Sequence, residues 1–91
     1  MTTPEQIAAS LSPGAARAVM AMTGEFQFPG KATFAWAGAE SAVKRNLVEY
    51  QLRAKPGGNP NYLYCAYRLK PLGQQVKDAL LKIEQEVNDA N

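Results

Sequence analysis

The 91-residue chain contains no histidine and a single cysteine, Cys65. One cysteine cannot form an internal disulfide bond, and one thiol without histidine cannot supply a zinc site. The absence of histidine also removes the commonest general acid and base near neutral pH, together with the partner of a nucleophilic serine or cysteine. We therefore expect no metal, no cofactor and no catalytic residue, and we predict that Cys65 is a core residue.

The sequence also lacks a long apolar run. No stretch approaches the roughly 20 residues that cross a bilayer, and the first residues lack the basic and then apolar layout of a signal peptide. These features predict a cytoplasmic protein. Hydrophobic residues make up 46% of the chain and charged residues 20%, which is typical of a globular protein. The length allows one domain, residues 1–91.

Two helix starts stand near the beginning of the chain. Thr3 is followed by proline and, three residues on, by Gln6, which is the pattern of a capping box. Ser12 repeats the capping device before a second apolar stripe that ends near Gly24. Residues 25–33 then predict a short extended piece and a turn, and alanine-rich residues 33–46 predict a third helix.

The second half of the chain predicts a β-hairpin and a last helix. Apolar and polar residues alternate over 48–54 and again over 61–70, on either side of a loop rich in glycine and proline. This hairpin occupies residues 48–70, and its alternation places Tyr67 and Leu63 on the core face. Residues 71–88 predict a helix whose apolar seam is Val76, Leu80, Ile83 and Val87.

The remaining aromatic residues are expected in two settings. We predict that Phe34 and Trp36 pack between helices, with Phe26 and Phe28 filling the floor beneath them. Tyr62 and Tyr64 are predicted to be exposed.

Two segments resemble a known family. The junction between the third helix and the hairpin reads Lys-Arg-Asn-Leu-Val over 44–48, and the second strand continues into the last helix as Tyr-Arg-Leu-Lys-Pro-Leu-Gly-Gln over 67–74. In these segments and in the order of its elements, the chain resembles winged helix-turn-helix DNA-binding domains, in particular MarR-like bacterial regulators and small phage proteins, over residues 11–82. The resemblance implies an α+β fold of three helices, a β-hairpin wing and a C-terminal helix.

The chain departs from the family pattern in two places. Asn46 stands where the family usually has glycine, and asparagine tolerates the left-handed backbone region better than most residues. Residues 25–37 contain Pro29, Gly30 and aromatic residues where the family has a second helix and a turn. This departure predicts a shortened helix-turn-helix.

The charge is concentrated in the middle of the sequence. Residues 31–77 hold eight basic and two acidic side chains, whereas residues 78–91 hold one basic and four acidic ones. A cationic hairpin after a cationic helix end is the pattern that duplex binding requires, because phosphate neutralisation supplies most non-specific affinity. The alternative for each basic residue is a solvated surface charge. The predicted DNA-binding residues are Ser41, Lys44 and Arg45 on the third helix and Arg53, Lys55, Gly57 and Gly58 on the wing.

The charge pattern predicts a small non-enzymatic protein that binds duplex DNA, and the resemblance implies a bacterial or phage protein that regulates transcription. One alternative is a winged-helix module that binds another protein and no DNA. A further alternative is a single-strand binder that stacks bases on Tyr62 and Tyr64. The resemblance also implies a homodimer through the C-terminal helix, although the seam is short for a coiled coil and can pack on its own core instead.

Overall fold

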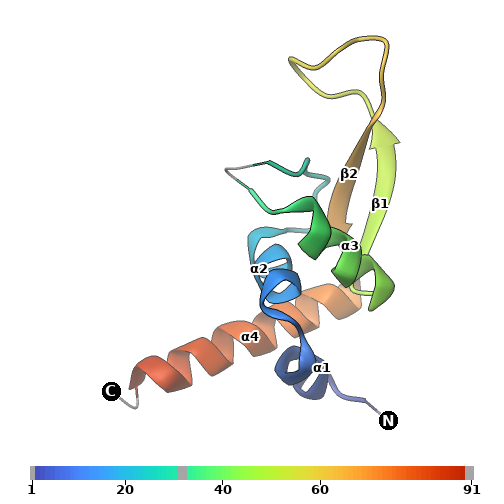
Figure 1. The fold of residues 1–91 in the computed structure, drawn as a ribbon. Helices are drawn as coiled ribbons and strands as arrows, with labels where there is room; N and C mark the ends of the chain where they lie inside the picture. Colours follow the sequence, from blue (N-terminus) through green and yellow to red (C-terminus); the bar gives the residue numbers. More distant parts are fainter. Residues whose placement is uncertain (1, 31–32, 90–91) are drawn as a thin grey trace.

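The computed structural model describes residues 2–30 and 33–89, with side chains through residue 86. These residues form four helices and one antiparallel hairpin, which confirms the predicted α+β class (Figure 1). The elements in chain order are α1 (Pro4–Ser10), α2 (Pro13–Ala21), α3 (Trp36–Lys44), β1 (Val48–Arg53), β2 (Tyr64–Leu69) and α4 (Pro71–Asp89).

Both N-terminal helices begin at their predicted caps. The Thr3 hydroxyl accepts a hydrogen bond from the Gln6 backbone N–H at 3.2 Å, and the Gln6 side chain accepts one from the Thr3 N–H at 2.9 Å. The Ser12 hydroxyl accepts from the Ala15 N–H at 3.3 Å. Each cap satisfies a backbone donor that the first helical turn leaves without a partner, and it thereby fixes where the helix starts.

The predicted hairpin is present, but its strands are shorter than expected. Its pairs run from Val48 opposite Leu69 to Arg53 opposite Tyr64. The second strand begins at Tyr64 and not at residue 61, because the Tyr62 N–H donates to the Asn59 carbonyl within the loop at 3.1 Å. This bond turns the chain away from β1, so residues 61–63 cannot join the ladder.

The segment after α2 lies along the edge of β2 that faces away from β1. Gln27 and Tyr67 exchange two backbone hydrogen bonds of 2.9 and 2.8 Å, and the Leu69 N–H donates to the Thr23 carbonyl at 2.9 Å. The short extended piece predicted over 25–33 is therefore present at Gln27. Residues 22–30 and 33–35 contain no helix, so one helix, α3, stands between this segment and the hairpin.

The third helix starts three residues later than predicted. The Thr33 hydroxyl donates to the Phe28 carbonyl at 2.8 Å, and the Gly30 N–H donates to the Phe34 carbonyl at 3.1 Å. These bonds hold residues 33–35 in a turn. At the other end, Asn46 has φ 63°, the left-handed conformation that its side chain tolerates.

The core lies between the helices and one face of the hairpin. Three buried hairpin residues point to this face: Val48 of β1, and Tyr67 and Leu69 of β2. Alternation along the strands selects this face, as predicted. The helical residues packed against it are Ile7 and Ala8 of α1, Ala18 and Val19 of α2, Ala39 and Ala42 of α3, and Val76 and Ala79 of α4.

Two close approaches allow only glycine. A Cβ atom at Gly38 of α3 would lie 2.4 Å from the Gly14 carbonyl oxygen of α2. A Cβ atom at Gly73 of α4 would lie 2.0 Å from the Leu47 carbonyl oxygen, just before β1. The missing side chains let backbones meet, so α3 sits closely on α2 and α4 sits closely on the base of the hairpin.

The aromatic predictions were partly wrong. Phe34 is buried and meets the Tyr67 ring edge-on at 5.9 Å between centroids, but Trp36 is 60% exposed. Phe26 does not lie beneath these residues, because Arg53 and Arg68 of the hairpin stack on its ring on the face opposite the core. Phe28 lines a groove together with Trp36 and Cys65.

The last helix packs on the core over its first half. Val76 is buried and Leu80 is half-buried, whereas Ile83 is 40% exposed. The side chain of Val87, the fourth residue of the predicted seam, lies outside the described part of the chain. α4 continues past α1 and α2 toward the C-terminus (Figure 1).

Candidate nucleic-acid interface

The face of the hairpin opposite the core carries two stacked arginines. Arg53 of β1 and Arg68 of β2 place their guanidinium carbons 4.2 and 4.4 Å from the centre of the Phe26 ring. An arginine over an aromatic ring is attracted by the ring's negative face. Phe26 therefore holds both cations on this side of the sheet.

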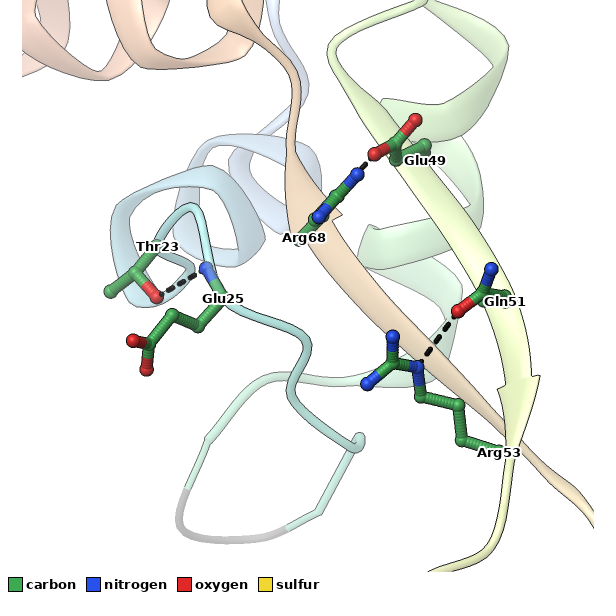
Figure 2. A network of polar contacts seen from close by, with 6 residues as sticks. All are labelled: Thr23, Glu25, Glu49, Gln51, Arg53 and Arg68. Atoms are coloured by element: carbon green, nitrogen blue, oxygen red, sulfur yellow. Dashed lines mark hydrogen bonds and ion pairs between the residues drawn. The ribbon is translucent and has the colours of Figure 1, made fainter.

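Polar neighbours orient the same two side chains. The Arg53 Nε donates to Gln51 at 2.8 Å, and Arg68 donates to Glu49 in an ion pair (Figure 2). Among residues 2–30 and 33–86, this is the one ion pair. The Glu49 carboxylate offsets the charge of Arg68, whereas the neighbour of Arg53 is a neutral amide, so Arg53 contributes the uncompensated positive charge.

Lys55 extends the cationic surface toward the loop. Its ammonium group lies 5.9 Å from the Phe28 ring centre and 5.7 Å from the Tyr64 ring centre. We call Arg53, Lys55 and Arg68, with Phe26 and Phe28, the outer cationic face. The chain contains no acidic residue between Glu49 and Asp78, so no carboxylate in the loop or in β2 offsets this face.

The loop glycines lie directly after this face. The Gly58 N–H donates to the Lys55 carbonyl at 2.9 Å, which closes a turn around Gly57. Gly57 has φ 77°, a conformation that glycine adopts without strain. The Tyr64 hydroxyl accepts from the Asn59 N–H at 3.2 Å and ties the loop back to β2.

The predicted site residues fall into two groups. Arg53, Lys55 and the loop glycines are at the distal end of the hairpin, whereas Lys44 and Arg45 end the helix that leads into its base (Figure 1). A six-residue strand spans about 20 Å, so the hairpin separates the groups by about that length. The Arg45 side chain donates to the Ser10 hydroxyl of α1, which directs it toward the helices.

Ser41 and Lys44 belong to the solvent side of α3. Lys44 is exposed and Ser41 is half-buried, and their spacing of three places them on one helical face. The Ser41 carbonyl accepts the Arg45 N–H at 3.2 Å, which completes the last turn. These two side chains can reach a ligand that lies along α3.

Sequence reasoning missed Arg68 and Phe26 as parts of the interface. Arg68 could have been found from the register, because pairing Val48 with Leu69 places it beside Glu49 on the outer side. Phe26 could not, since its position depends on the docking of residues 23–28 against β2.

The core side of the distal hairpin is apolar and uncovered. Tyr50 and Leu52 of β1 are 57% and 56% exposed, and Leu63 was wrongly predicted to be buried. A groove of about 360 Å³ is lined by Trp36, Leu63 and the half-buried Cys65, and it extends to Phe28 and Lys55 of the outer cationic face. The helices end before reaching this part of the sheet, which explains why the core alternation continues without burial.

One titratable group is shifted inside the core. The Tyr67 hydroxyl donates to the Glu40 carboxylate at 2.7 Å. Burial, and next the hydrogen bond to Glu40, raise the pKa of Tyr67 above its usual value. The phenol therefore stays neutral and joins β2 to α3.

The described residues contain no group of three histidine, cysteine, aspartate or glutamate side chains that could hold a metal ion. No helix within them is both long enough and apolar enough to cross a membrane.

Comparisons of the chain with protein-family models, with curated proteins and with solved structures find no match.

Proposed function

We propose that the chain is a small non-enzymatic winged-helix protein that binds duplex DNA, with the β1–β2 hairpin as its wing. It would act in transcription regulation by occupying a site on DNA, as the MarR-like resemblance implies. The observation that carries this proposal is the outer cationic face, where Arg53 and Lys55 stand near the wing tip with no carboxylate between them and the tip.

The geometry of Arg53 favours binding to phosphate. Its guanidinium is held by the Phe26 ring and by Gln51, so fewer rotamers are lost when a phosphate oxygen binds. A planar guanidinium can donate two hydrogen bonds to one phosphate group. Lys55 adds a second charge next to it, and each phosphate contact contributes to affinity through counterion release.

The charge distribution orients the domain on DNA. The acidic side chains Asp78, Glu84 and Glu86 lie along α4, at the far side of the molecule from the wing tip (Figure 1). Repulsion from phosphate keeps this helix away from the duplex. Ser41 and Lys44 on α3 provide a second contact beside the wing.

The alternative class is a protein-interaction module with the same fold. It is favoured by the exposed Trp36, Tyr50 and Leu52, because exposed apolar patches often mark protein contacts. Tyr50 and Leu52 lie on the other face of β1 from Arg53, and substitutions at these positions separate the two functions experimentally.

An amide chemical-shift titration with a mixed-sequence duplex tests the proposal. We expect the amides of Arg53, Lys55 and Gly57 to shift together at low salt and to recover as salt is added. Shifts at Lys44 show whether the end of α3 also contacts DNA. The proposal is wrong if no amide shifts at low salt.

A matched titration with a single strand of the same sequence tests the stacking alternative. Tyr62 is exposed, as predicted, while Tyr64 is half-buried beside Lys55. Duplex binding predicts larger shifts with the duplex than with the single strand. Tighter binding of the single strand, with the largest shifts at Tyr62 and Tyr64, supports the stacking alternative instead.

A further inference from the structure

The outer edge of β1 is open. On one side β1 pairs with β2, and β2 in turn pairs with Gln27 on its far side. On the other side of β1, the described residues make no backbone hydrogen bond to residues 50–53. An open edge presents a row of N–H and C=O groups that can pair with another strand.

This edge lacks several of the features that usually prevent strand pairing. Residues 48–53, Val-Glu-Tyr-Gln-Leu-Arg, contain no proline and no lysine, and the ladder with β2 has no bulge. Residues 50–52 are uncharged, and two of them, Tyr50 and Leu52, are largely exposed. Such a strand favours association.

The sequence of the strand is complementary to itself. In an antiparallel pair, two facing residues must both point their backbone N–H and C=O groups toward the partner strand or both point them away. Successive residues alternate in this respect. When a strand pairs with its own copy, the twofold axis must therefore pass through a residue and not between two residues. With the axis at Gln51, Glu49 faces Arg53 of the second copy, and Arg53 faces Glu49 of the second copy. Tyr50 then faces Leu52 of the second copy on the other side of the sheet.

We propose that β1 pairs antiparallel with β1 of a second copy of this chain, about a twofold axis at Gln51. The pairing joins two hairpins into one continuous sheet, matches opposite charges on the outer face and covers Tyr50 and Leu52 on the inner face. Such an interface uses the same patch on both copies and closes as a dimer. It does not depend on DNA binding and is measured without DNA. Because it places Glu49 of the second copy opposite Arg53, it competes with phosphate for that side chain.

This surface differs from the terminal-helix surface that the family resemblance implies. The exposed apolar residues of α4, Leu81 and Ile83, are on another element of the molecule. A Leu81→Glu variant therefore serves as a control. The β1 pairing predicts that it leaves the dimer intact, and a monomeric Leu81→Glu variant would overturn the proposal.

Cysteine cross-linking tests the register. In a Cys65→Ser background, Gln51→Cys places the two introduced thiols at directly facing positions, whose Cα atoms are about 4.5–5.5 Å apart, within disulfide range. Glu49→Cys is the matched control on the same face, because its two copies are about 13 Å apart. We expect a covalent dimer under mild oxidation from Gln51→Cys and at least tenfold less from Glu49→Cys. Equal yields, or none from either variant, would overturn the proposal.

Charge exchange tests the same contact without new thiols. Glu49→Arg and Arg53→Glu each place like charges opposite one another twice, so each variant alone is expected to dimerise at least tenfold more weakly in sedimentation equilibrium. An equimolar mixture restores both opposite-charge pairs and is expected to recover the dimer. Circular dichroism checks that each variant is folded, since Glu49→Arg also removes the partner of Arg68. A mixture that stays monomeric while both variants are folded contradicts the pairing.

Discussion

The two ends of one face of the hairpin have different surroundings. At the base, Val48 and Leu69 are buried against the helices. Two to four residues further along the same face of β1, Tyr50 and Leu52 are mostly exposed. The alternation of apolar residues is the same at both ends. Alternation therefore identifies a face of a sheet, and the reach of the helices decides how much of that face becomes core.

This contrast divides the hairpin by role. The basal half stabilises the domain through packing, whereas the distal half presents Arg53 and Lys55 on one side and apolar residues on the other. Substitutions at the base should therefore lower stability, and substitutions at the tip should alter binding.

The largest effect on stability is expected at the contact between α4 and the hairpin base. Gly73→Ala forces a methyl group against the Leu47 carbonyl and should lower the free energy of unfolding by ~3 kcal/mol or more. Gly14→Ala is the control, because a Cβ atom there meets nothing within 4 Å. That variant should be neutral or more stable by ~0.5–1 kcal/mol in urea denaturation. An equal loss of unfolding free energy in the two variants would show that the close contact between Gly73 and Leu47 does not limit the stability of the domain.

A pair of leucines compares the two halves directly. At concentrations where the chain is monomeric, Leu69→Ala at the base should lower the free energy of unfolding by about 2–5 kcal/mol, whereas Leu52→Ala near the tip should change it by less than about 0.5 kcal/mol. Both side chains point to the same face of the sheet. Thermal and urea denaturation of both variants measure the difference, and similar losses would remove the distinction between the halves.

Removal of the Tyr67 hydroxyl should have an intermediate effect. Tyr67→Phe keeps the ring packed on Phe34 but removes the hydrogen bond to Glu40, which should lower the free energy of unfolding by ~1.5–3 kcal/mol near neutral pH. Urea denaturation measures this change. An unchanged free energy of unfolding would show that the hydrogen bond between Tyr67 and Glu40 does not stabilise the base of the hairpin.

The same residue predicts a pH dependence. Because the pKa of Tyr67 is raised above 10.0 in the folded state, the unfolded chain loses this proton first as pH rises. The stability from the neutral phenol is complete below about pH 10, and it should decline above that pH by up to ~1.4 kcal/mol per pH unit. Urea denaturation between pH 8 and about pH 11 should show a smaller decline for Tyr67→Phe. Parallel curves would contradict the shift.

The smallest effect is expected where α3 turns into β1. Asn46 has φ 63°, so Asn46→Ala should lower the free energy of unfolding by ~1 kcal/mol, while Asn46→Gly should cost less. Urea denaturation of the two variants measures the order. Equal stability of both would show that the turn is not strained by a side chain.

The features that depend on neighbouring residues could be predicted from the sequence. The caps at Thr3 and Ser12 and the core face of the hairpin follow from short patterns, and the structure has all three. The start of α3 was missed because the bonds that delay it join Thr33 and Gly30 to Phe28 and Phe34. The spacing of apolar residues within the helix does not predict this turn.

The candidate site was predictable only as a set of charges. The lack of acidic residues after Glu49 pointed to the hairpin, but the stacking of Arg53 and Arg68 on Phe26 needs residues 23–28 to dock beside β2. The exposure of Trp36 likewise depends on which helices are near it in space. Docking between segments that are distant in the sequence cannot be predicted from the local spacing of residues.

The salt dependence of duplex affinity tests the central claim most directly. A double variant, Arg53→Gln with Lys55→Gln, should reduce the slope of log affinity against log salt by about two relative to the unmodified chain, since each phosphate contact contributes about 0.9. Lys82→Gln on the acidic α4 is the matched control and should leave the slope unchanged. A slope that is the same for the unmodified chain and the double variant would contradict DNA binding through the outer cationic face.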